Sequence, residues 1–143
     1  MVKDIVFDKK KYAIIISSDH HSDGIEFLTE STYSQQLAYM HHPEGKYIDA
    51  HIHNIEKRQI EYTQEVLIVR RGKLRVDFYT EEKQYIESTV LSDGDVILLV
   101  SGGHGFKVLE ELEMIEVKQG PYLETNDKVR FSHIEDENVI IRS

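Results

Sequence analysis

Four side chains of this sequence have the types and spacing that bind a metal ion. His51 and His53 flank Ile52 in a segment typical of a β-strand, so both imidazoles should lie on one face, about 6.6 to 6.8 Å apart along the backbone. Glu65 and His104 follow further along the chain. Three imidazoles and one carboxylate suit one divalent ion of iron, manganese, nickel, zinc or copper better than calcium. Four ligands on an octahedral ion leave two positions for water or substrate, as Lewis-acid or oxygen-activating chemistry requires.

The environment of Glu65 follows from strand alternation. Leu67 and Val69 share its face, so the carboxylate should point inward above an apolar floor. The alternative is a buried acid paired with Arg70 or Arg75. Alternation sends Arg70 to the opposite face, which weakens that alternative.

Two interpretations of Glu116 and Lys118 stay open. In the first they lie inside the fold near the metal, where Glu116 acts as a general acid or base. In the second they belong to a solvated strand face, as most charged residues do. Glu61, shortly before Glu65, is a further candidate for proton transfer.

Four more residues are candidates for contact with a small-molecule ligand, together with Lys118. Tyr39 and Tyr62 would stack on a sugar or another ring, and Arg58 would receive a carboxylate or phosphate. Phe106 continues the strand face of His104. The structural alternatives are ordinary strand tyrosines and a solvated loop arginine.

Histidines also occur in Asp19-His20-His21-Ser22-Asp23 and in His41-His42. The first stretch looks like a second metal site, and the second offers the same alternative. We interpret them as polar loops, because adjacent histidines on an extended chain point apart and Asp23-Gly24 is a turn signal.

Almost every periodic segment has the two-residue alternation or the β-branched composition of a strand. The predicted strands are Tyr12–Ser17, Ile25–Leu28, Gln36–His41, Tyr47–His53, Tyr62–Arg70, Leu74–Tyr79, Tyr85–Leu91, Asp95–Val100, Gly105–Leu109 and Leu112–Gln119. Arg71-Gly72, Asp93-Gly94 and Gly102-Gly103 separate some of them as turns. Thr29–Gln35 is the one predicted helical turn. Val139-Ile140-Ile141 would form a last strand on the barrel or on a partner subunit.

Length and charge limit the possible functions. A chain of 143 residues fits one domain, and its net charge of −9 would be repelled by nucleic acid. It contains no cysteine, so thiolate ligands and disulfides are excluded. The N-terminus lacks signal-peptide features and no apolar run would span a membrane, so we expect a cytoplasmic protein.

The order of these residues resembles the two sequence motifs of the cupins. The first motif has an HxH pair, a Glu and a Gly seven residues after that Glu; here these are His51-Ile52-His53, Glu65 and Gly72. The second opens with Gly-Asp and closes with a Gly-rich bend and a His. Here it runs from Gly94-Asp95 to Gly102-Gly103-His104. The resemblance covers about residues 50–104.

The resemblance implies an all-β fold with little helix, the double-stranded β-helix or jelly-roll barrel. It implies a single domain over residues 1–143. N-terminal strands would occupy 1–46, the barrel core with both motifs 47–119, and a tail 120–143.

The resemblance also implies that His51, His53, Glu65 and His104 bind the metal. Cupins usually have three or four residues between the HxH pair and the Glu, whereas eleven lie between them here. We place the extra length in a loop before the strand of Glu65. Glu61, near the end of that loop, is the alternative carboxylate ligand.

More narrowly, the chain resembles small, mostly uncharacterised cupins, some associated with surface-polysaccharide or nucleotide-sugar metabolism. This implies a homodimer and a small-molecule ligand, with no nucleic-acid or membrane partner. One hypothesis is an enzyme acting on a sugar derivative or a keto or hydroxy acid, as a metal-dependent isomerase or epimerase, a lyase or a dioxygenase. The alternative is a cupin that binds or senses a ligand without turnover.

Overall fold

The structure, a computed structural model, describes residues 1–121 and 128–142. It divides into two compact units, one formed by Met1–His20 with Gln64–Ser143 and the other by His21–Thr63. We name the first the sheet unit and the second the hairpin unit.

Nearly all regular structure in the described residues is β-strand, as the sequence predicts. The strands are β1 (Val2–Phe7), β2 (Lys10–Ile16), β3 (Gly24–Phe27), β4 (Ala38–His41), β5 (Glu65–Tyr79), β6 (Tyr85–Leu91), β7 (Val96–Leu99) and β8 (Gly103–Lys118), with a short 3-10 turn at Asp136–Asn138. Within residues 1–121 and 128–142, no helix has the length and apolar character needed to cross a membrane.

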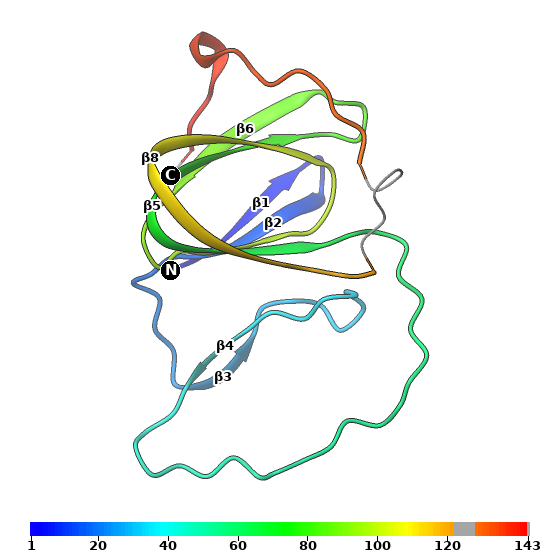
Figure 1. The fold of residues 1–143 in the computed structure, drawn as a ribbon, viewed down its shortest axis with the longest axis vertical. Coiled ribbons are helices and arrows are strands. Elements are labelled where there is room, and N and C mark those ends of the chain that lie inside the picture. The colour runs from blue at the N-terminus through cyan, green and yellow to red at the C-terminus, as the bar shows by residue number, and fades with distance from the viewer. Residues whose placement is uncertain (122–127, 143) are drawn as a thin grey trace. The chain divides into compact units, whose positions relative to one another are not determined.

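The six strands of the sheet unit form one strongly curled antiparallel sheet (Figure 1). Its order is β1-β2-β7-β5-β6. One edge of β5 pairs first with β7, over Glu65–Ile68, and then with β6, over Leu74–Tyr79. The other edge pairs with β8 along the whole of β5. Strands β5 and β8 therefore form a long two-stranded ribbon, the β5–β8 ribbon, around which the sheet is organised.

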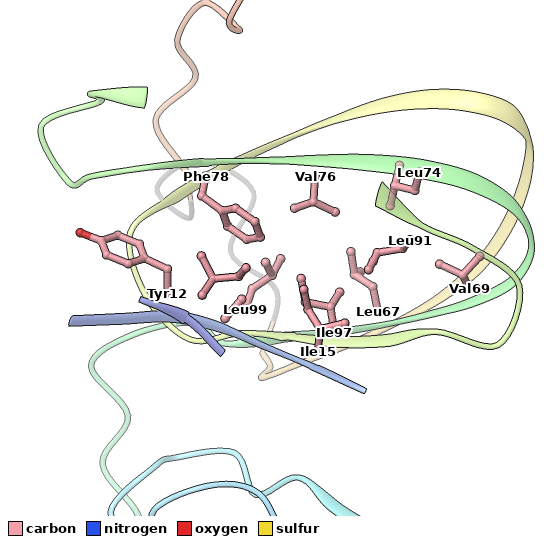
Figure 2. Packing of buried hydrophobic residues seen from close by; sticks show 12 residues of the cluster. Tyr12, Ile15, Leu67, Val69, Leu74, Val76, Phe78, Leu91, Ile97 and Leu99 are labelled. Carbon is pink, nitrogen blue, oxygen red and sulfur yellow. The ribbon is translucent and has the colours of Figure 1, made fainter. Parts of the chain in front are cut away.

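The hydrophobic core lies between the two halves of the curled sheet. Figure 2 shows Leu74, Val76 and Phe78, from the second half of β5, facing the layer that holds Ile15 of β2 and Ile97 of β7. These side chains are buried together with Leu67, Val69, Leu91 and Leu99. Burial of each such side chain stabilises the fold by about 1.5–3 kcal/mol. One strand can line both layers only because it bends between Val69 and Leu74.

Gly72 lies at this bend, where the register between β5 and β8 shifts. Its φ of +95° falls in the region that residues with a Cβ rarely adopt. A Cβ at this position would lie 1.9 Å from the carbonyl oxygen of Glu111 on β8. The Gly72 amide donates a hydrogen bond to Asp93 Oδ1 at 2.6 Å. Glycine is therefore required both for the backbone conformation and for the close approach of β8.

The predicted strands agree with the sheet unit in most places. Tyr85–Leu91 coincides with β6, and β2 and β7 lie within the predicted ranges or overlap them. The predicted hairpin turn at Arg71-Gly72 is wrong, because the strands before and after it form one continuous bent strand. Gly105–Leu109 and Leu112–Gln119 likewise belong to one strand, β8. Strand β1 was not predicted, since Ile5 is its one buried residue.

Two predictions for the hairpin unit are wrong. No strand forms over Tyr47–His53, where the side chains are exposed and no neighbouring strand supplies backbone hydrogen bonds. The predicted helical turn Thr29–Gln35 is an irregular loop. In it the Gln36 amide donates to the carbonyl oxygens of Glu30 and Tyr33, so a side chain competes with helical hydrogen bonding.

The hairpin unit contains one antiparallel pair of strands. β3 pairs with β4 in a register that sets Gly24 opposite His41.

The C-terminal segment adds one contact to the sheet unit, where Ile141 forms a single parallel bridge with Ser88 of β6. The predicted last strand over Val139-Ile140-Ile141 does not form, and this segment contacts the sheet through that one bridge.

Replacing Gly72 with alanine should destabilise the protein by at least about 2 kcal/mol, because left-handed backbone costs an L-residue roughly 1–2 kcal/mol and the contact with Glu111 adds to it. Urea unfolding followed by circular dichroism measures this loss. Gly45→Ala is the control, since Gly45 also has positive φ but nothing within 4 Å of an added Cβ. Equal losses in the two variants would contradict the close approach at Gly72.

Candidate functional site

Glu65 and His104 contact each other directly. Glu65 begins β5 and lies between Leu99 of β7 and Lys118 of β8, so its position is fixed by strands on both sides. His104 lies near the start of β8, opposite Phe78. The Nε2 atom of His104 is 3.2 Å from Oε2 of Glu65. The structure thus brings together two of the four predicted metal ligands.

The contact depends on the curl of the sheet. Glu65 and Phe78 are thirteen residues apart on β5, so a flat strand would separate them by about 43 Å. His104 pairs with Phe78, yet its ring reaches Glu65 at the other end of the same strand. The β5–β8 ribbon must therefore curl back on itself. The prediction that Glu65 points inward above Leu67 and Val69 is confirmed, because all three are buried.

Positive groups surround the Glu65 carboxylate. Its side chain is only 9% exposed, and Lys118 Nζ lies 3.9 Å from Oε1. The hydrogen bond from His104 lowers the pKa of Glu65 below its ordinary value of 4.5, and the charges of Lys128 and Lys118 lower it further, against the opposing effect of burial. Glu65 is therefore held as a carboxylate, which is the form that binds metal ions.

Lys118 connects this carboxylate to a second one. Its ammonium group lies 3.7 Å from Oε1 of Glu116, whose side chain is 42% exposed. Lys118 thus lies beside Glu65, whereas the exposure of Glu116 agrees with the solvated-face interpretation of that residue. The role of Glu116 in proton transfer stays a prediction. On the side of His104, the ring of Phe106 lies with its centroid 5.2 Å from that of the imidazole.

The other two predicted ligands belong to the hairpin unit. His51 and His53 are exposed, and their ring centroids lie 5.1 Å apart at an interplanar angle of 83°. His51 Nδ1 lies 2.9 Å from the backbone oxygen of Asp49. The rings are close to each other even though the predicted strand does not form. Their role as ligands of the same ion as Glu65 and His104 stays a prediction.

The remaining candidates are also in the hairpin unit. Arg58, Glu61 and Tyr62 are exposed in the segment before β5, and Tyr39 is partly buried on β4 opposite Glu26. Their roles in ligand binding and proton transfer stay predictions.

A cleft of about 310 Å³ opens beside β5 and β8 of the sheet unit. It is lined by Arg75, Asp77, Phe106, Lys107, His133, Glu135 and Asp136. Buried Arg75 donates two hydrogen bonds to Asp77, at 2.8 and 3.1 Å, so the predicted alternative partner of Glu65 is occupied elsewhere. Hydrogen bonds from Lys107 and Arg75 lower the pKa of Asp136 to about 2. The cations of this cleft are thus neutralised by its own carboxylates.

Sequence reasoning missed residues that support the site from outside the motifs. The Gln64 amide donates to Gln119 Oε1 at 2.6 Å, and the Gln64 side chain donates to the Val100 carbonyl oxygen at 3.3 Å. These bonds tie the start of β5 to the ends of β8 and β7. Cross-strand register decides such contacts, and no spacing along the chain reveals it.

Comparison with known proteins gives no relative of this chain. No family model, no curated protein and no solved structure matches it.

Replacing Glu65 with glutamine should flatten the pH dependence of stability. A carboxylate whose pKa is lowered on folding contributes stability above the pKa of the unfolded chain, and this contribution is lost as the pH falls through the folded value. The wild-type free energy of unfolding should therefore fall below pH 4.5 more steeply than that of Glu65→Gln. Urea titrations at a series of acidic pH values measure both curves.

The matched control is Glu116→Gln, which removes a more exposed carboxylate from the same group of residues. This substitution should change the dependence on pH less than Glu65→Gln does, because solvent screens the charge of an exposed side chain. Parallel curves for the wild type and Glu65→Gln would contradict the electrostatic environment described for Glu65.

Proposed function

We propose that this chain is a metal-dependent cupin, with a jelly-roll barrel that holds one divalent ion and binds a small polar molecule there. The observation that carries the proposal is the convergence of Glu65 Oε2 and His104 Nε2 at 3.2 Å. These residues come from the two separate sequence motifs that resemble those of cupins. Their meeting is the relation that a shared metal ion requires.

The geometry of the pair fits two ligands of one ion. Nitrogen and oxygen ligands bind first-row metals at about 2.0–2.2 Å, so two neighbouring ligand atoms lie roughly 3.0–3.5 Å apart. The 3.2 Å separation falls in this range. His104 remains 30% exposed beside the buried carboxylate, which leaves one side of the pair accessible.

The resemblance of the sequence motifs assigns His51 and His53 as the two remaining ligands, and this assignment rests on the sequence. Two imidazole rings within 5.1 Å of each other offer donor atoms that reach one ion together. The ligand set is then three neutral nitrogens and one carboxylate. This set suits iron, manganese, nickel or zinc.

A divalent ion in this site would supply Lewis-acid chemistry, polarising an oxygen atom of the bound molecule. Lys118 lies 3.9 Å from the metal-binding carboxylate and 3.7 Å from Glu116, so on this proposal the two residues hold or move a proton on that molecule. Phe106 provides an apolar wall beside His104. Sugar derivatives and keto or hydroxy acids have the oxygen atoms that such an ion would bind.

Protein purified without chelating resin should contain about one equivalent of a divalent first-row metal that survives gel filtration. The double variant His51→Ala/His53→Ala should lose most of it, because it removes two of four ligands. Inductively coupled plasma mass spectrometry gives the metal content of both proteins. The exposure of both histidines favours retention of the fold, which circular dichroism checks.

His133→Ala serves as the control, since His133 is an exposed histidine of the cleft that the proposal does not assign to the metal. It should keep the wild-type content. Equal metal in the wild type and in His51→Ala/His53→Ala would overturn the proposed ligand set.

A further inference from the structure

A second group of metal-ligand side chains meets in the hairpin unit. Within the part of the chain that the structure describes, donor atoms of His21, Asp23 and His41 all lie within 4.8 Å of one another. This group contains no member of the four-residue set discussed above. We propose that His21, Asp23 and His41 form a separate binding site for a divalent first-row metal ion.

Strand pairing creates the group from residues that are far apart in sequence. The register of β3 and β4 sets Gly24 opposite His41, so Asp23, which precedes Gly24, arrives beside the imidazole of His41. Gly24 has a φ of +81°, a backbone conformation that favours glycine and turns the chain at this point. His21 lies close to the same carboxylate oxygen, Asp23 Oδ1. The polar-loop interpretation took each stretch by itself and did not include this pairing.

The distances among the three residues are those of ligands around one ion. Asp23 Oδ1 lies 3.2 Å from His41 Nδ1 and 3.6 Å from His21 Nε2. The two imidazole rings are 4.5 Å apart between centroids, with an interplanar angle of 63°. Two ligand atoms bound at about 2.1 Å to one ion lie roughly 3.0–4.2 Å apart. The distances from Asp23 Oδ1 to the two imidazole nitrogens fall in this range. A small inward movement of exposed side chains is enough to bring all three into coordination.

The chemistry and exposure of the group indicate what it would bind. Two imidazole nitrogens and one carboxylate oxygen select zinc, iron, cobalt or nickel over calcium and magnesium. The side chains are 62%, 90% and 46% exposed for His21, Asp23 and His41 respectively. Three protein ligands in so open a position leave the other coordination sites to water or to an added ligand. Such a site exchanges its metal readily, unlike a buried four-ligand centre.

Zinc titration of the full, chelator-treated chain tests the proposal. Imidazole resonances followed by NMR report each histidine separately, so this site is distinguished from His51, His53 and His104. The resonances of His21 and His41 should shift together and saturate along one curve. Asp23→Asn should weaken this binding by at least roughly tenfold, because it removes the charged ligand and keeps the side-chain shape.

His20→Ala is the matched control, because His20 is adjacent to His21 and outside the group. It should bind zinc as the wild type does, whereas His21→Ala and His41→Ala should each lose saturable binding. The proposal is overturned if zinc leaves the His21 and His41 resonances unchanged. It is also overturned if Asp23→Asn binds as tightly as the wild type, or if His20→Ala weakens binding as much as His21→Ala.

Discussion

The bend in β5 between Val69 and Leu74 is the constraint on which the sheet unit depends. Before the bend β5 pairs with β7, and after it β5 pairs with β6, so one strand belongs to both layers around the core. Gly72 permits the bend through its positive φ and its missing Cβ. The β5–β8 ribbon curls back as a result, and the start of β5 meets the start of β8. The contact between Glu65 and His104 follows from this closure.

In the curled sheet, apolar side chains of β5 fill the interior, and a pair of charged side chains of the same strand lies outside this apolar cluster. Leu67, Val69 and Phe78 fill the interior, where their burial drives the closure. On the second half of β5, Arg75 and Asp77 alternate with the buried Val76 and Phe78 and form a buried ion pair. Asp77 also accepts a hydrogen bond from the Ser88 hydroxyl at 2.5 Å. Breaking such a pair costs about 3–5 kcal/mol, because one charge is left buried without its partner. The strand that carries the proposed metal ligand is thus held in place on both of its faces.

The strand content and the inward position of Glu65 could be predicted from the sequence for a clear physical reason. Alternation depends on neighbouring residues alone, so it correctly directed Glu65 inward with Leu67 and Val69. The continuity of β5 through Gly72 depends on the approach of β8, which is about forty residues further along the chain. A glycine between two apolar runs is therefore compatible with a turn and with a bent strand.

The errors in the hairpin unit have a related cause. Tyr47–His53 has strand-like residues but no neighbouring strand, and pairing rather than propensity decides whether such a segment becomes β-structure. The contact of His21 and Asp23 with His41 was not predicted, because local sequence does not reveal the hairpin register that joins them. In both units, the contacts between candidate metal ligands depend on the pairing of strands that are distant in sequence. Residue type alone identified the candidates, and the folded chain determines which of them meet.

The most direct test of this account is the nuclear Overhauser effect between the imidazole protons of His104 and the side-chain methylene protons of Glu65. The curled ribbon predicts clear cross-peaks between them, because the Nε2 and Oε2 atoms are 3.2 Å apart. The same spectrum should show contacts between His104 and its strand partner Phe78. Cross-peaks to Phe78 without any to Glu65 would mean that the β5–β8 ribbon forms but does not close, and would contradict the account.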